Sequence, residues 1–139
     1  MDRQVIEQKI DSLRRCVIRI QAKCPATADE LQRDIDAQDI LSLNLTRAVQ
    51  LCVDIGAHLI AELEAPAPST MGQTFDLLAA AGVIGDTLAL RLKKAVGFRN
   101  LAVHDYEAIN WVIVHALARR HLNDFREFAK AVVAKYNEP

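Results

Sequence analysis

Apolar residues recur every three or four positions from the start of the chain, which is the spacing of a helix that buries one face. This pattern predicts a first helix over residues 2–22. Pro25 ends it, because the residue before a proline is forced out of the α-helical region. The apolar face of this helix consists of Ile6, Ile10, Leu13, Val17 and Ile20.

A second apolar pattern begins at Thr27 and continues to about Leu63. Thr27 and Glu30 form a T-x-x-E capping box, in which each side chain accepts a hydrogen bond from a free backbone N–H near the helix start. The pattern predicts one helix spanning roughly 50 Å at 1.5 Å per residue, with Gly56 as a weak point or a site of close helix packing. Apolar residues fall on more than one side of this helix, so we expect it to contact both its own bundle and a second subunit.

The second half of the chain predicts three further helices after a proline-containing linker at residues 65–70. A short helix at 74–81 is followed by a helix that Asp86 caps. A long last helix is expected over 106–134. The predicted fold class is therefore all-α, an antiparallel bundle of four main helices and one short helix in a single domain covering residues 1–139.

The composition agrees with a helical fold. Hydrophobic residues make up 51% of the chain and aromatic residues only 5%, whereas a sandwich or barrel needs more turns and more aromatic or β-branched residues. The net charge of −1 argues against non-specific DNA binding, which depends on many cations. A local basic segment without acids nevertheless lies between Thr87 and Val103, and its cations are Arg91, Lys93, Lys94 and Arg99.

No segment of the sequence predicts export or membrane insertion. The charged N-terminus does not have the pattern of a secretory signal, and there is no stretch of about 18 apolar residues. The three cysteines form no C-x-x-C pair, which favours reduced thiols. We therefore expect a cytoplasmic protein that does not span a membrane.

Residues with catalytic chemistry gather in the segment Phe98–Tyr106. It contains Arg99, Asn100, His104 and Tyr106 among aliphatic neighbours. A continuous helix places Arg99 and His104 about 140° apart around its axis, so they do not share a face. If both act on one target, the helix bends or ends between them, or a second chain completes the site.

These residue types suit metal-free cleavage of RNA, in which the ribose 2′-OH attacks the adjacent phosphate. Histidine can remove the hydroxyl proton or protonate the leaving oxygen near neutral pH, and arginine offers a planar fork of donors to the phosphate oxygens. Tyr106 can bind a phosphate oxygen, orient His104 or stack on a base. One chain supplies one such histidine, so acid and base together require a water, or a symmetric dimer with two histidines and two arginines across one cleft.

The spacing R-x4-H-x-Y, with asparagine directly after the arginine, resembles the motif of the HEPN ribonucleases and in particular that of the HepT-like toxins. The resemblance covers most of the chain and includes the helical pattern at Asp39–His58. It implies the toxin of a type II toxin–antitoxin system, a metal-independent endoribonuclease that acts as a homodimer and needs no cofactor. The catalytic positions of the family correspond to Arg99 and His104. The supporting or RNA-binding positions would be Asn100, Tyr106, Arg91 and Lys94.

The resemblance also implies a mode of regulation. HepT toxins are paired with MntA-type antitoxins, which are minimal nucleotidyltransferases. The antitoxin inhibits the toxin by transferring AMP to the motif tyrosine, which is Tyr106 in this chain. AMP at this position would add negative charge and bulk inside a phosphate-binding cleft and thereby exclude RNA.

Other interpretations of the same residues stay open. HEPN-like bundles also occur as non-catalytic adaptors that bind a partner nucleotidyltransferase, and such a chain could be the antidote of the pair instead of its toxin. Arg99 and Asn100 could simply end a helix, and Tyr106 could be a packing aromatic. A further hypothesis places Asp39 or Asn44 of the second helix against the motif.

A metal site has little support in the sequence. His115 and His121 are six positions apart, whereas four is the useful spacing for shared ligands on a helix. His104 and Asp105 are adjacent but lack a further cluster of ligands. We therefore expect no metal site, and we interpret the basic run at 118–121 as a solvated face.

Overall fold

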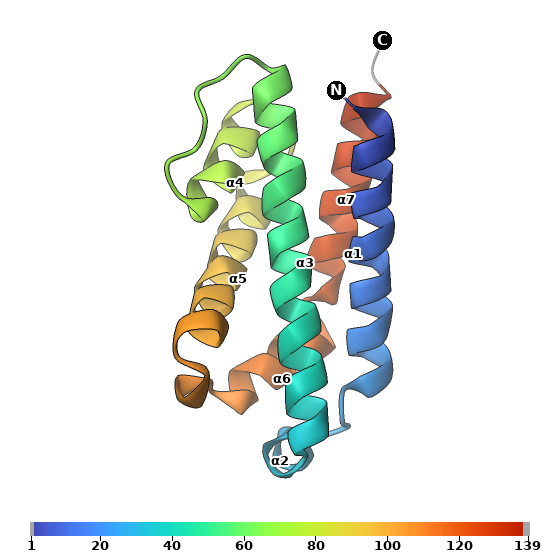
Figure 1. Ribbon diagram of the computed structural model, residues 1–139, viewed down its shortest axis with the longest axis vertical. Coiled ribbons are helices and arrows are strands. Elements are labelled where there is room, and N and C mark those ends of the chain that lie inside the picture. The colour runs from blue at the N-terminus through green and yellow to red at the C-terminus, as the bar shows by residue number, and fades with distance from the viewer. Residues whose placement is uncertain (1, 138–139) are drawn as a thin grey trace.

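Helix α3 (Ile35–Glu62) is the central element of the structure, and the other long helices pack along it (Figure 1). On one side of α3 lie α1 (Arg3–Lys23) and α7 (Leu122–Tyr136). On the other side lie α4 (Met71–Ala80) and α5 (Asp86–His104). Both ends of the chain lie at the same end of the bundle, and shorter elements lie at the opposite end, where α3 begins.

The computed structural model describes residues 2–137, and this part of the chain contains no strand. Helices α2 (Ala28–Arg33) and α6 (Trp111–Arg120) close the end of the bundle opposite to the chain ends. The short 3-10 helix η1 (Tyr106–Ala108) connects α5 to α6. The all-α prediction is confirmed, although several predicted helix boundaries are not.

The second predicted helix is divided into α2 and α3. The Thr27 cap is confirmed, since its Oγ1 accepts a hydrogen bond of 3.2 Å from the Glu30 N–H. The chain then leaves helical geometry at Asp34 (φ −112°, ψ 93°), whose carboxylate accepts a hydrogen bond of 3.0 Å from the Ala37 N–H. Aspartate satisfies the free N–H groups of a first turn well, so Asp34 starts a new helix where the apolar pattern alone predicts continuity.

The prediction of one last helix over 106–134 is wrong, because this segment forms η1, α6 and α7. Asn110 caps α6 by accepting hydrogen bonds from the N–H groups of Val112 and Ile113 at 3.0 and 3.4 Å. His121 then separates α6 from α7 with a non-helical backbone (φ −119°, ψ 9°). The described residues therefore form seven α-helices and one 3-10 helix, in which the four longest helices, α1, α3, α5 and α7, match the four main helices predicted and the short elements are more numerous than predicted.

Gly56 is a site of close helix packing. It is buried on α3, and a Cβ built there would lie 2.5 Å from Thr74 Cγ2 and 3.1 Å from Leu78 Cδ1, both on α4. No side chain larger than hydrogen fits this approach without a shift of α4. The glycine therefore sets how closely α4 approaches the central helix.

By length and composition alone, helix α3 meets the criteria for a membrane-spanning helix. In its most apolar window 56% of the residues are buried inside the bundle. The core helix of a bundle passes the same test, and α3 packs against α1, α4 and α5.

Candidate functional site

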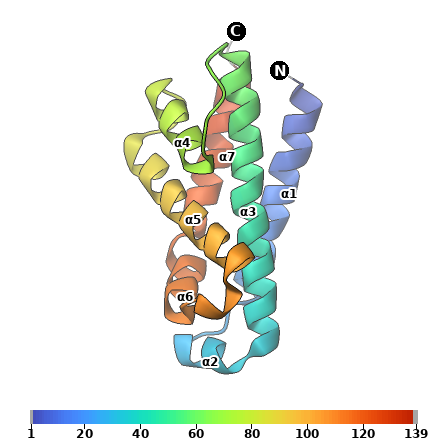
Figure 2. The same cartoon turned by 60° about the vertical axis from the view of Figure 1, so that its left-hand side comes forward.

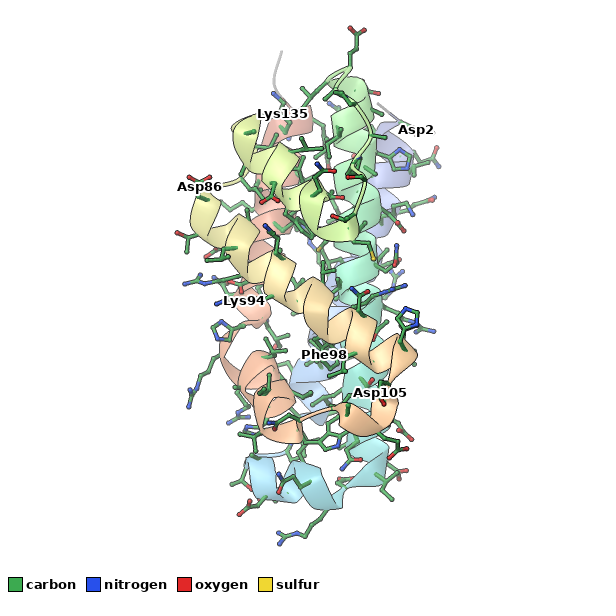
Figure 3. The ribbon with its side chains drawn as sticks, turned by 90° about the vertical axis from the view of Figure 1, so that its left-hand side faces the viewer. Asp2, Asp86, Lys94, Phe98, Asp105 and Lys135 are labelled. Atoms are coloured by element: carbon green, nitrogen blue, oxygen red, sulfur yellow. The ribbon has the colours of Figure 1, made fainter. Side chains whose placement is uncertain are left out.

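The motif lies at the end of α5, which crosses the bundle from Asp86 to Asp105 (Figure 3). The helix continues through His104 and ends at Asp105, whose N–H still donates to the Leu101 carbonyl at 2.8 Å. It therefore neither ends nor breaks between Arg99 and His104. At 100° per residue the two side chains leave the helix in directions about 140° apart. Of the alternatives raised by the sequence, completion of the site by a second chain fits this geometry.

Arg99 and His104 differ in their exposure. His104 is exposed at the last position of the helix. Arg99 is half-buried, and its Nη1 donates to Asn100 Oδ1 at 3.1 Å. Its Nε is buried and has no hydrogen-bond partner among the described residues. A buried donor without an acceptor is costly, so a movement of the side chain that lets Nε–H donate to a further acceptor, such as a phosphate oxygen, is favourable.

Tyr106 is tied to α3 through its hydroxyl group. The hydroxyl donates to Asp39 Oδ1 at 2.7 Å, and the ring packs edge-to-face on Trp111 with 5.8 Å between centroids. Burial raises the pKa of Tyr106 to about 12, and the hydrogen bond and negative charge of Asp39 act in the same direction. The phenol is therefore a neutral donor at physiological pH.

Of Asp39 and Asn44, the two residues expected against the motif, only Asp39 contacts it. Figure 2 shows the end of α5 beside the half of α3 that carries Asp39. Asn44 is buried and donates to the carbonyl of Ile40 in its own helix at 2.8 Å. Trp111 is half-buried against the motif tyrosine, a contact that no spacing in the sequence indicates.

The basic residues of α5 that the sequence singles out differ in their ion pairs. Arg91 Nη1 lies 3.4 Å from the carboxylate of Asp124 on α7, and Lys93 Nζ lies 3.0 Å from that of Asp76 on α4. Burial raises the pKa of Asp124, and the positive charge of Arg91 opposes this shift. Lys94 is exposed. The structure thus pairs Arg91 and Lys93 with carboxylates of neighbouring helices, whereas Lys94 and Arg99 form no ion pair among residues 2–137.

Two further histidines, His115 and His121, have structural partners. His115 Nε2 lies 2.9 Å from the carbonyl oxygen of Pro25, and His121 Nδ1 lies 3.8 Å from Asp124 Oδ2. Within residues 2–137 no three His, Cys, Asp or Glu side chains are grouped as metal ligands would be. Arg119 and Arg120 are exposed, as expected of a solvated face.

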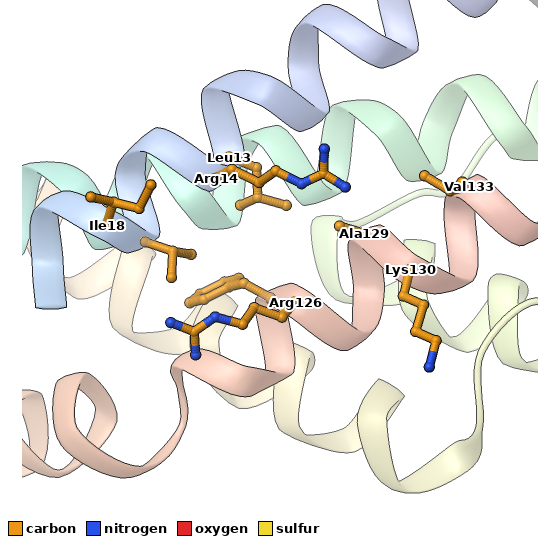
Figure 4. A pocket seen from close by; sticks show the side chains of 9 residues that line it. Leu13, Arg14, Ile18, Arg126, Ala129, Lys130 and Val133 are labelled. Carbon is orange, nitrogen blue, oxygen red and sulfur yellow. The ribbon is translucent and has the colours of Figure 1, made fainter.

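An apolar groove lies between α1 and α7, away from the motif residues (Figure 4). Its volume is about 460 Å³, and it has Leu13, Val17 and Phe125 in its wall. Arg126 at its rim donates to Gln21 Oε1 at 3.2 Å. No motif residue lines this groove, so it is not part of the candidate site.

Comparisons with known proteins match nearly the whole chain. The sequence model of the family described as "Ribonuclease HepT-like" matches residues 6–132. The chain is 36% identical to the mRNA nuclease HepT of Shewanella oneidensis (strain MR-1) over 131 residues, which is 94% of this chain and 98% of that protein.

Two solved structures have the same fold over nearly their full length. A toxin–antitoxin structure with AMP-PNP superimposes with a TM-score of 0.89 at 35% identity, covering 94% of this chain and 98% of that chain. The tri-AMPylated HEPN toxin of Shewanella oneidensis, in complex with an MNT antitoxin, gives a TM-score of 0.88 at 36% identity and covers 96% and 99%. With matches of this extent in both sequence and structure, the chain belongs to the HepT-like ribonuclease family.

Proposed function

We propose that this protein is the toxin of a type II toxin–antitoxin pair, a metal-independent endoribonuclease whose active site forms between two copies of the chain. The observation that carries the proposal is the complete R-x4-H-x-Y motif at the exposed end of α5, in a chain that aligns with an mRNA nuclease over 94% of its length. The substrate is RNA, because the chemistry needs a 2′-OH beside the scissile phosphate.

His104 serves as the general base or acid of the reaction. As base it takes the proton of the 2′-OH, the 2′ oxygen forms a bond to phosphorus, and the bond from phosphorus to the 5′ oxygen breaks. The leaving 5′ oxygen takes a proton from a water molecule, and the resulting hydroxide is neutralised by the proton that His104 has taken up, which gives a 2′,3′-cyclic phosphate and a 5′-OH end. Arg99 donates to the phosphate oxygens, whose charge grows in the transition state, and Asn100 orients Arg99 through their hydrogen bond.

A symmetric dimer supplies what one copy lacks. The two directions of Arg99 and His104 on a continuous α5 support a site in which one copy provides the arginine and the other the histidine. Two apolar side chains of the motif segment are exposed in the single chain, namely Leu101 and Val103. Their burial against a second copy would stabilise the dimer that the site requires.

Tyr106 is the point of regulation by a nucleotidyltransferase antitoxin of the MntA type. A relative of this chain is tri-AMPylated in complex with its MNT antitoxin. AMP on the Tyr106 oxygen removes the hydrogen that Asp39 accepts and places a phosphodiester charge beside that carboxylate. The repulsion displaces the modified ring from α3 into the cleft, where it blocks RNA. The proposed RNA substrate and the nucleotide used by such an antitoxin support a cytoplasmic location.

The test is expression of this chain alone, beside Arg99→Ala and His104→Ala variants of confirmed solubility. We expect growth arrest and RNA fragmentation with the wild type only, and cleavage by the purified protein in the presence of EDTA. Normal growth with intact RNA in all three strains would refute the nuclease function and favour the adaptor or antidote.

A further inference from the structure

A second groove, lined by basic residues, lies between α1 and α3. Its volume is about 660 Å³, and α1 and α3 form its two walls. Arg15 and Arg19 contribute from α1, and Arg47 contributes from α3. All three side chains are exposed.

The charges of this groove are available to a ligand. Arg15 and Arg19 are four positions apart and so lie on one face of α1, about 6 Å apart along the helix axis. Arg15 donates only to Ser12 Oγ, at 3.0 Å. Arg19 and Arg47 form no hydrogen bond or ion pair with any other residue of the part that the structure describes.

The acid in the groove lining is already compensated. Asp54 Oδ2 lies 3.7 Å from Lys9 Nζ, and Asp54 Oδ1 accepts a hydrogen bond of 2.9 Å from Gln50. The groove therefore has an excess of positive charge although the chain as a whole has a net charge of −1. Such a concentration of cations is complementary to a polyanion.

The groove and the motif contact share helix α3. Ile40, which lines it, directly follows Asp39, the partner of the Tyr106 hydroxyl. Positions Asp39, Leu43 and Arg47 succeed one another at intervals of four and so follow one side of the helix. They cover about 12 Å along its axis, starting at the motif.

The walls suit a single strand of nucleic acid. Leu43 is 50% exposed, and together with Ile40 and Leu51 it gives the groove an apolar surface between the arginines. Unpaired bases pack on such a surface, while the guanidinium groups bind phosphates. The lining contains no aromatic ring on which bases could stack, so the contacts of the arginines with phosphates supply most of the binding.

We propose that this groove holds single-stranded RNA next to the scissile phosphate, with Arg15, Arg19 and Arg47 as the phosphate contacts. The proposal rests on the proposed ribonuclease function and adds a substrate-binding site outside the motif. It explains how a chain of near-neutral net charge binds a polyanion. It also predicts that substrates long enough to reach the groove bind more tightly than short ones.

The first test measures RNA binding without cleavage. A fluorescent single strand of about 12 nucleotides is titrated against the His104→Ala protein over a range of salt concentrations. Arg19→Gln and Arg47→Gln are added together, and the control carries Arg119→Gln and Arg120→Gln, which remove the same charge from an exposed face on α6. We expect the groove variant to bind about tenfold more weakly and the slope of log affinity against log salt to fall by about 1.4, since each lost phosphate contact contributes about 0.7. Equal losses in both variants, or none in the groove variant, would overturn the proposal.

The second test separates the groove from the catalytic motif. With His104 intact, the groove variant should raise KM for the long strand and leave cleavage of a dinucleotide unchanged, because a dinucleotide has one phosphate and does not reach the groove. A loss of the dimer or of antitoxin binding in sedimentation runs, with RNA affinity retained, would assign the groove to a protein partner and refute our proposal. If the wild type cleaves no RNA, the nuclease function fails, while the binding test still decides whether RNA occupies the groove.

Discussion

Replacing Asp39 by asparagine tests the contact that joins the motif to the central helix. The change keeps the size of the side chain and removes the negative charge that accepts the Tyr106 hydroxyl at 2.7 Å. Burial raises the pKa of Tyr106 to about 12, and the hydrogen bond and charge of Asp39 add to the shift. The pKa in the Asp39→Asn variant should therefore fall toward the ordinary value of about 10 without reaching it, because burial of the ring remains.

The size of the effect allows a direct optical measurement. At about pH 11 a phenol with a pKa of about 12 is roughly one tenth ionised, and one with the ordinary pKa is roughly nine tenths ionised. The chain has two tyrosines, so Tyr136→Phe in both proteins leaves Tyr106 as the only chromophore of this kind. Phenolate absorbance is compared while circular dichroism confirms that both proteins remain helical. An unchanged ionised fraction would show that Asp39 does not act on this hydroxyl in solution.

The same variant should also change the modification of Tyr106. At neutral pH almost no phenolate exists in either protein, so the hydroxyl must lose its proton as its oxygen attacks the α-phosphate of the nucleotide and pyrophosphate leaves. Asp39 is placed to accept this proton, and general-base catalysis contributes at least about 100-fold in rate. We expect AMP transfer by the antitoxin to slow by about this factor, as followed by mass spectrometry, while RNA cleavage by the unmodified variant persists. Equal rates of transfer to both proteins would refute the role of Asp39 as proton acceptor.

The remaining predictions concern the tyrosine, the dimer and the core. Tyr106→Phe should remain toxic in the presence of the antitoxin because it lacks the oxygen that accepts AMP, and a growth assay with both proteins checks this; protection by the antitoxin would contradict it. Mixing the inactive Arg99→Ala and His104→Ala proteins should restore about a quarter of the wild-type nuclease activity if the two residues act across the dimer. Half of the dimers are then mixed, and one of the two sites in each mixed dimer is intact. No recovery of activity would place both residues of a site in one chain. Thr74→Val should stabilise the protein by about 1 kcal/mol, and raise the Tm by about 3 °C, because the buried Thr74 hydroxyl has no partner; a lower Tm would show that the hydroxyl is satisfied in solution. Gly56→Ala should cost about 1–2 kcal/mol in denaturant unfolding, because its Cβ would lie 2.5 Å from Thr74 Cγ2; an unchanged midpoint would mean that α4 shifts freely.

The sequence predicts most accurately the features that are set within a single helix, such as which of its positions are buried. All five apolar positions predicted for the first helix are buried in α1. The breaks at Asp34 and Asn110 were not predicted, because polar capping residues occur inside segments whose apolar pattern looks continuous. At both sites a side chain accepts hydrogen bonds from the following N–H groups, and this local gain outweighs the continuation of the helix.

For the parts of the site that join distant segments, the sequence offered Asp39 or Asn44 as the residue that faces the motif but could not distinguish between them. Asp39 and Tyr106 are 67 positions apart, and their contact depends on how α5 and η1 meet the end of α3. The basic groove likewise depends on the rotation of α1 against α3. The spacing of Arg15 and Arg19 was a local signal for a basic face, but nothing in it indicated that Arg47 lies opposite.

The continuity of α5 determines how the motif can function. Because the helix does not break between Arg99 and His104, one chain cannot turn both side chains toward the same phosphate without distorting its own backbone hydrogen bonds. The proposed dimer avoids that cost, since its two-fold axis would bring the arginine of one copy to the histidine of the other. Under this proposal catalysis depends on protein concentration, because the site exists only in the dimer. The proposed modification of Tyr106, two residues after His104, would then act where the two copies and the RNA meet, so a single AMP group would interfere with both assembly and substrate binding.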